Sequence, residues 1–494
     1  MPIKWQVIIP ISLALTFLVF TSFFFPFRGK IQFDGDEGIN LMRSMLVVMG
    51  KPLYTEISSD QPPLFTHLLA LLLRVTGFEV SPARMLVILF ASLLVWACSQ
   101  MLMITHGWRA SMLFLPLIIM APRFLVLSVS VMIGLPAISL AAVALLGLLL
   151  WQRDQRQIWL VLSGLAMALS LLIKLFTVFM APLILAGILL TIYLRERRFT
   201  WPLLRPALAW SISFGGLGLV LGLALVGPQN IPQIILPHLL APAQAGFRGA
   251  NFAINTHLQP ALPLLLLGAF GALLALLRRQ WLALYPLGWA VLAYILLLWH
   301  APVFYHHQLL ITVPAAMLAA IGIDQGLGML VSAIGRWSLP RPFARLASGL
   351  LTVLLLGVLI NSAIPTLQSE LVDSTQTDSF ALRGTAGKLK VLNLMADYAD
   401  RTRWILTDMP MYAFLVRRLV PPLLATFSEK RLLTDSITAE EVLATLRAYN
   451  PEQVMLARFN LPLLDEYLAL NYSLVASPEF FRLYIRKDLL ILAQ

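Results

Sequence analysis

Long runs of apolar residues, separated by short polar connections, dominate the first three quarters of the chain. A helix needs roughly 20 apolar residues to cross the hydrocarbon core of a bilayer. The run at 62–77 is shorter and opens with two prolines, so we predict a helix at the membrane surface there. The longer runs predict eleven membrane-spanning helices, at about 5–27, 83–105, 110–127, 132–151, 157–174, 177–194, 203–227, 260–277, 281–299, 306–323 and 345–363.

Basic residues between the predicted spans indicate the orientation of the chain. Short loops that carry Lys and Arg stay on the cytoplasmic side of a membrane. With the N-terminus in the cytoplasm, every basic cluster between spans falls on that side, from Arg109 to Arg345. The first loop at 28–61, the loop at 228–259 and the C-terminal tail are then on the outer side.

The tail has a different pattern. Residues 364–494 carry 14 basic and 15 acidic residues, so this part is nearly neutral. Thr438 and Glu441 form a capping-box sequence, which predicts the start of a helix ending near residue 449. We therefore predict a transmembrane domain at 1–363 followed by a small α/β domain at 364–494. Its apolar runs predict strands at 403–408, 453–459 and 481–486.

Composition agrees with a polytopic α-helical membrane protein. The chain is 59% hydrophobic and 12% charged, with a mean hydropathy of +0.83, which is unlike a soluble globular protein. The net charge of +12 comes from residues 1–363, which hold 22 basic and nine acidic residues. Because this excess lies in short loops between spans, it reflects topology and does not indicate nucleic-acid binding. One cysteine, Cys98, cannot form an intrachain disulfide.

Acidic residues are concentrated in the first predicted outer loop. Ionisable groups beside a membrane are costly and tend to mark functional sites. A carboxylate at this surface can act as a general base on an acceptor hydroxyl or amine. Alternatively, an acid here can cap a helix, since negative charge favours the first turn. Five of the nine acids in residues 1–363 fall within 27 positions, at Asp34, Asp36, Glu37, Glu56 and Asp60.

Two short motifs in this loop resemble the GT-C glycosyltransferases. The closest resemblance is to the glycosyltransferase family 39-like group, which includes the protein O-mannosyltransferases and the aminoarabinose transferases that modify lipid A. The order of spans, surface helix and C-terminal outer domain is similar over essentially the whole chain. The motifs that carry the resemblance are Asp36-Glu37 after the first span and, about 25 residues on, Gln61-Pro62-Pro63-Leu64.

The resemblance implies a polyprenyl-phosphate-linked sugar donor and an inverting transfer, with Asp36 as the catalytic base beside Glu37. No nucleotide sugar is expected, in agreement with the lack of a Gly-rich phosphate loop in the sequence. We assign Asp34, Asp60 and Gln61, from the same loop, as candidate substrate-binding residues.

The chain departs from the family pattern at three places. Gln61 stands where related proteins often have Lys or His. Ile39 and Asn40 replace an Arg-Tyr pair of the aminoarabinose transferases, which argues against that substrate. The segment 128–136 contains no acid, although the second outer loop of the family often has one.

Other candidate residues lie outside the first loop. Lys174, at the outer end of the fifth predicted span, can extend to lipid headgroups or bind a donor phosphate as a point charge. Arg248 can be solvated or bind phosphate. The adjacent His306 and His307 are a possible pair of metal ligands, but adjacent histidines rarely both point at one ion, so we assign no metal site. A divalent metal ion stays an open alternative without support in the sequence, and no other cofactor is indicated. Three polar residues lie at the start of the tenth predicted span: Tyr305, His306 and His307. They can form a belt at the membrane interface, or one of them can contact the donor phosphate.

The sequence thus predicts transfer of a sugar from a polyprenyl-phosphate donor to a lipid, glycan or protein acceptor at the outer membrane face. The alternative is a multispan lipid or solute transporter or flippase. Transporters tend to have inverted repeats and broken helices at the midplane, whereas no repeat is evident in this sequence and its acids cluster at the surface. We expect membrane lipids and no nucleic acid as partners, and a location in the bacterial inner (plasma) membrane with a cytoplasmic N-terminus.

Overall fold

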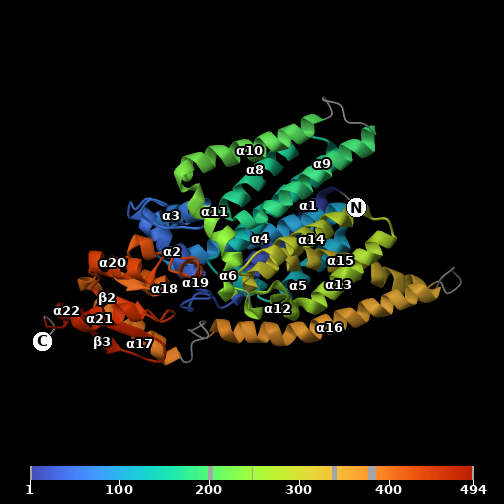
Figure 1. The fold of residues 1–494 in the computed structure, drawn as a ribbon. Helices are drawn as coiled ribbons and strands as arrows, with labels where there is room; N and C mark the ends of the chain where they lie inside the picture. The colour runs from blue at the N-terminus through green and yellow to red at the C-terminus, as the bar shows by residue number, and fades with distance from the viewer. Residues whose placement is uncertain (1–2, 198–203, 248, 336–341, 376–384, 492–494) are drawn as a thin grey trace.

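The chain folds into a bundle of long helices and a small mixed domain, drawn in orange and red (Figure 1). Two short helices, α2 (Gly35–Val48) and α3 (Leu64–Thr76), lie where the two parts meet. The computed structural model describes residues 3–197, 204–247, 249–335, 342–375 and 385–491.

Within these ranges, nine helices are long and apolar enough to cross a membrane. Two further predicted spans are the shorter apolar helices α5 (Trp108–Ile119) and α8 (Gln157–Ile173). The chain is therefore a polytopic α-helical membrane protein, as the apolar pattern predicts. The nine long spans are built on α1 (Ile3–Phe24), α4 (Val80–Thr105), α7 (Gly134–Asp154), α9 (Met180–Glu196), α10 (Arg205–Leu225), α13 (Leu262–Leu277), α14 (Leu284–Trp299), α15 (Leu309–Gly335) and α16 (Pro342–Thr375).

Two interruptions in the bundle account for the shorter helices. The predicted span at 110–127 is divided, because Arg123 adopts a left-handed conformation between α5 and α6 (Phe124–Val129). α8 ends at Lys174, whose backbone is extended, and a 3-10 turn at Leu175–Phe179 leads into α9. Lys174 therefore lies at a break between two helices.

The start of α2 is set by its first acids. Asp34 is the N-cap, and its carboxylate accepts a hydrogen bond from the backbone N–H of Asp36 at 2.8 Å. The sequence allowed Asp36 to cap this helix, but the structure gives that role to Asp34. The run predicted as a surface helix at 62–77 forms α3, whose N-cap is Pro63.

The tail domain is built on one four-stranded sheet with strand order β1-β2-β4-β3. β1 (Ile405–Thr407) pairs in parallel with β2 (Gln453–Leu456), and the other pairs are antiparallel. The sequence predicts β1, β2 and β4 (Arg482–Arg486) but not β3 (Tyr472–Ala476). The predicted domain boundary at 363/364 falls inside α16. The helices of this domain are α17 (Thr385–Asp397), α18 (Pro410–Leu415), α19 (Glu429–Leu433), α20 (Ala439–Tyr449), α21 (Asp465–Asn471) and α22 (Lys487–Ile491).

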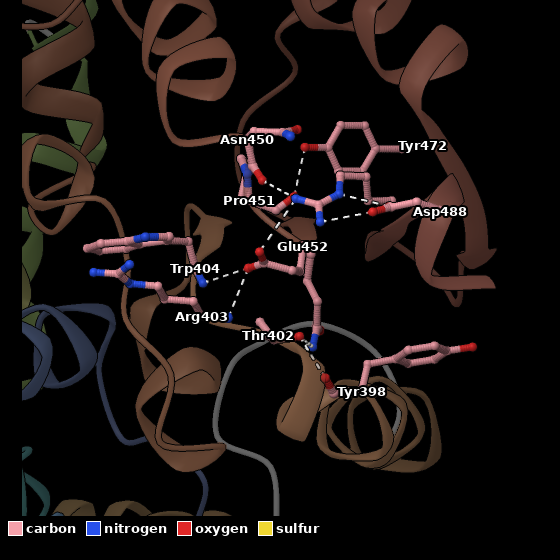
Figure 2. A network of polar contacts seen from close by, with 11 residues as sticks. Tyr398, Thr402, Arg403, Trp404, Asn450, Pro451, Glu452, Tyr472 and Asp488 are labelled. Carbon is pink, nitrogen blue, oxygen red and sulfur yellow. Dashed lines mark hydrogen bonds and ion pairs between the residues drawn. The ribbon is translucent and has the colours of Figure 1, made fainter. Parts of the chain in front are cut away.

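A polar network at one end of the sheet ties β1, β2 and β4 together (Figure 2). Glu452 accepts hydrogen bonds from the backbone N–H groups of Arg403 and Trp404, both at 2.9 Å. Arg486 lies 3.5 Å from Glu452 and donates to Asp488 at 2.8 Å. The opposite ends of β1 and β2 carry the segments that meet the membrane part.

The tail domain docks directly on α2. Helix α18 packs against α2, and a Cβ atom at Gly38 would lie only 2.4 Å from the backbone nitrogen of Met411. The Thr426 hydroxyl also donates a hydrogen bond to the carbonyl of Ser58 at 2.8 Å. The first loop and the tail domain, far apart in sequence, therefore form one surface.

Candidate active site

A cavity of about 270 Å³ lies where α2, the α8–α9 break and the tail domain meet. Glu37 does not line it, and Arg248 lies outside the described residues. The cavity brings together eight of the ten residues singled out from the sequence: Asp34, Asp36, Asp60, Gln61, Lys174, Tyr305, His306 and His307.

Two acids at the start of α2, Asp34 and Asp36, line the cavity, and they differ in their hydrogen bonds. Asp34 is held on both sides, because its two oxygens accept hydrogen bonds from the Asp36 N–H and, at 2.6 Å, from the Tyr305 hydroxyl. Burial, together with the charge of Asp36, raises the pKa of Asp34 to about 6. Asp36 is exposed in the cavity wall, and its carboxylate accepts no hydrogen bond from any described residue. Asp36 is thus placed to take a proton from a bound molecule.

Glu37 has a different environment from its neighbour. Its side chain is fully buried, and its two oxygens accept hydrogen bonds from Arg84 at 2.8 and 2.9 Å. The backbone N–H groups of Phe33 and Val131 donate to the same carboxylate at 3.0 and 3.2 Å. The sequence predicts Glu37 as a catalytic residue beside Asp36, but both of its carboxylate oxygens are already hydrogen-bonded within the protein. We therefore assign Glu37 to positioning the first loop.

Lys174 is one of the cations of the cavity. Its residue is only 9% exposed, and its ammonium lies 5.0 Å from the centre of the Phe176 ring. No described carboxylate lies within ion-pair distance of it, although the charges of Asp36 and Asp60 act on it. A snorkelling lysine would reach the headgroups along an exposed path, whereas Lys174 is enclosed in the cavity wall.

Asp60 and Gln61 are held by contacts from several elements. Lys430 of α19 forms an ion pair with the Asp60 carboxylate, and Tyr54 donates a hydrogen bond to the Gln61 carbonyl at 2.7 Å. His238, on α11 (Ile231–Leu240), contacts the Asp60 carbonyl at 3.1 Å. Burial opposes ionisation of Asp60, but the Lys430 ammonium holds the pKa of this carboxyl below its usual range.

Aromatic rings form part of the cavity wall. Phe176 packs against His300 and His307, with ring centroids 4.3 and 4.8 Å apart. The Nδ1 atom of His307 accepts a hydrogen bond from the Phe304 N–H at 3.0 Å, while Nδ1 of His306 is buried without a partner in the described part. Among the residues that the structure describes, no three His, Cys, Asp or Glu side chains are grouped to hold a metal ion.

Sequence reasoning missed several cavity residues, among them Arg43, His300, Lys430 and Arg458. Arg43 follows Asp36 by seven positions on α2, a spacing that places both on one helix face and could have indicated it. Lys430 and Arg458 come from the tail domain, and no local pattern links them to the first loop. The buried Asp408 orients the Arg458 loop by accepting hydrogen bonds from the backbone N–H groups of 457–459.

An apolar groove of about 420 Å³ lies beside the polar cavity. Pro62 follows Gln61, and Leu175 follows Lys174, so the cavity and the groove share two short segments of chain. The other groove residues come from α8, α10 and α11, including Ala168, Leu171, Leu172, Phe214, Gly215, Gly218, Leu219, Gly222, Leu223, Ile231, Ile234 and Ile235.

Comparison with known proteins identifies the fold. No protein-family model matches the sequence, and no curated protein matches it. The structure is similar to ArnT from Cupriavidus metallidurans bound to undecaprenyl phosphate, with 15% identity, a TM-score of 0.58 and 98% of each chain covered. It is also similar to the archaeal oligosaccharyltransferase AglB from Archaeoglobus fulgidus in complex with an inhibitory peptide and a dolichol-phosphate. That match has 13% identity and a TM-score of 0.56, and covers 98% of this chain and 74% of AglB.

Both neighbours are GT-C glycosyltransferases. This chain has the GT-C fold. The predicted resemblance is thereby confirmed at the level of the fold, and the match to ArnT includes both the membrane helices and the tail domain.

Proposed function

We propose that the protein transfers a sugar from a polyprenyl-phosphate-linked donor to a hydroxyl or amine of a lipid, glycan or protein acceptor. The observation that carries this proposal is the unengaged Asp36 carboxylate, which shares a polar cavity with Lys174 beside an apolar groove. A base, a cation and an apolar channel are the three features that a lipid-phosphate donor and a protic acceptor require.

The junction between groove and cavity supports a position for the donor in this proposal. Its polyprenyl chain lies along the apolar side chains of α8, α10 and α11, and its phosphate reaches Lys174 and Gln61 where the lining becomes polar. Undecaprenyl phosphate and dolichol-phosphate, the lipids bound by the two GT-C neighbours, have this combination of a long apolar chain and one phosphate.

The transfer step then follows from the positions of the charged groups. The acceptor oxygen or nitrogen attacks the anomeric carbon of the sugar, and Asp36 takes the acceptor proton. The bond from the anomeric carbon to the phosphate oxygen breaks on the opposite side, which inverts the configuration. The electron pair stays on the departing polyprenyl phosphate, which Lys174 binds through its charge.

Orientation is also part of the proposal. The basic loops support a cytoplasmic N-terminus, and with this orientation an active site beside the tail domain would be on the outer face of the bacterial inner membrane. The acceptor enters from the aqueous side, past the tail domain.

Reconstitution tests the function directly. Proteoliposomes containing the protein receive polyprenyl-phosphate sugar with a radiolabel in the sugar, together with lipid, glycan and peptide acceptors from the same cell envelope. We expect label to move to an acceptor while unlabelled polyprenyl phosphate accumulates. Movement of intact labelled donor across the bilayer, with no acceptor labelled, would instead support the transporter or flippase alternative.

A further inference from the structure

Residues of the tail domain line part of the cavity. Four of its residues that line the cavity lie at or next to α19: Thr426, Ser428, Glu429 and Lys430. Of these, Lys430 forms an ion pair through its ammonium with the Asp60 carboxylate of the first loop. The side chains of the two partners are only 12% and 10% exposed.

This ion pair lies within the cavity. Both partners line it, together with Lys174 and Asp36. The charge of Lys430 acts on Lys174, and it also acts on His238, which contacts the Asp60 backbone. A small anion in this space would therefore lie within reach of two ammonium groups, one from the membrane part and one from the tail domain.

The charge of the proposed reaction calls for a second cation. A polyprenyl-phosphate sugar is a phosphodiester with one negative charge. The polyprenyl phosphate that departs is a monoester, whose charge approaches −2 near neutral pH. The charge of Lys174 matches that of the bound donor, and a further positive charge would stabilise the phosphate as its bond to the anomeric carbon breaks. Asp60 neutralises Lys430 in the structure, and the neighbouring Gln61 has no charge.

We propose that Lys430 is a second phosphate ligand, which moves from Asp60 to the departing polyprenyl phosphate as that phosphate gains charge. This inference rests on the proposed transferase function. The bond that breaks joins the anomeric carbon to the phosphate oxygen, and the electron pair remains on that oxygen. Asp60 holds Lys430 between turnovers. Docking of the tail domain is thus part of catalysis.

The proposal separates the kinetic roles of the two lysines. An interaction formed only as charge develops stabilises the transition state more than the bound donor, so losing it lowers kcat. Lys430→Gln should therefore reduce kcat by roughly 10- to 100-fold, the usual effect of one bond to a charged group. Lys174→Ala should mainly weaken donor affinity. Lys430→Arg should retain part of kcat, because the charge stays while the geometry changes.

A double variant distinguishes this role from a structural one. Lys430→Gln alone leaves the buried Asp60 carboxylate unpaired, which can destabilise the fold. Asp60→Asn/Lys430→Gln removes both charges and should regain a wild-type Tm while kcat stays reduced. Recovery of both Tm and kcat in the double variant would show that Lys430 serves only to neutralise Asp60, which overturns the proposal. Lys390→Gln, an exposed site on α17, is the matched control and should leave kcat unchanged.

Binding of polyprenyl phosphate to the detergent-solubilised wild-type protein separates failure of this inference from failure of the proposed function. The product should bind wild type more tightly than the double variant, by roughly the same factor as the change in kcat. Wild-type protein that neither turns over the donor nor binds polyprenyl phosphate would overturn the transferase proposal and this inference with it. Active wild type with equal product affinity in the double variant would overturn this inference alone.

Discussion

Asp36 and Glu37 are adjacent in sequence but have opposite environments. Successive residues of a helix point about 100° apart, so Asp36 faces the cavity while Glu37 enters the protein interior. The four hydrogen bonds to Glu37 fix the connection between the first span and α2. The first loop is therefore held in position by Glu37 and presents Asp36 to the cavity.

Glu37→Gln should lower stability more than it alters chemistry. The substitution removes the charge that compensates the fully buried Arg84, and breaking a buried pair costs about 3–5 kcal/mol when no other partner remains. Arg84 keeps its bonds to the carbonyls of Phe27 and Lys30, so we expect the lower end of that range. Thermal unfolding in detergent measures this.

Glu56→Gln is the matched control for Glu37→Gln. Glu56 pairs with Lys51 at 2.8 Å but is 43% exposed, and surface pairs contribute about 0–1 kcal/mol. An equal Tm for both variants would contradict the positioning role of Glu37.

At the scale of elements, the site depends on contacts between helices that are distant in sequence. α18 can approach α2 because Gly38 has no side chain. α11 contacts the Asp60 segment through His238, and α19 contacts it through Lys430. These three helices together hold the first loop in position.

Gly38→Ala should weaken docking of the tail domain. The new Cβ would lie 2.4 Å from the Met411 backbone nitrogen, so α18 must shift, and such overpacking costs about 1–3 kcal/mol. We expect a lower Tm and slower transfer. Gly29→Ala is the control, because a Cβ there meets no atom within 4 Å. Wild-type transfer by Gly38→Ala would show that the close packing is dispensable.

His238 should make stability depend on pH. Burial, followed by the charge of Lys430, lowers the pKa of His238 to about 4, below the usual value of about 6.5 in an unfolded chain. The unfolded state therefore takes up a proton first. The neutral imidazole therefore contributes fully to the free energy of unfolding above pH about 6.5. This contribution declines as the pH falls toward 4.

His238→Gln isolates this contribution, since Gln can still donate to the Asp60 carbonyl. The Tm of wild type relative to His238→Gln should fall as pH is lowered from 7 to 5. A difference in Tm that stays constant over this interval would contradict a buried neutral histidine.

At the scale of the whole molecule, local patterns predict much of the fold and part of the site. Apolar runs give the spans, and the capping box at Thr438 and Glu441 gives α20. Contacts across the chain are not predicted: Arg84 pairs with an acid 47 positions away, and Lys430 with one on the first loop. Arg84 and Lys430 meet their acidic partners only when the helices pack, so no pattern in the neighbouring sequence indicates these pairs.

The orientation of the molecule gives a further prediction. In a Cys98→Ser background, a cysteine at Ala448, on the exposed face of α20, should react with an impermeant thiol reagent in intact cells. A cysteine at Arg153, in the last turn of α7, should react only after lysis. The reverse pattern would move the proposed active site to the cytoplasmic side.

The central claim is that Asp36 is the base of a sugar transfer, and Asp36→Asn tests it most directly. Asparagine keeps the shape of the side chain but cannot accept the acceptor proton, and general base catalysis contributes roughly 100- to 10,000-fold. In reconstituted protein we expect kcat to fall by at least about 100-fold, with polyprenyl-phosphate binding and Tm close to wild type. Turnover by Asp36→Asn near the wild-type rate would contradict the account.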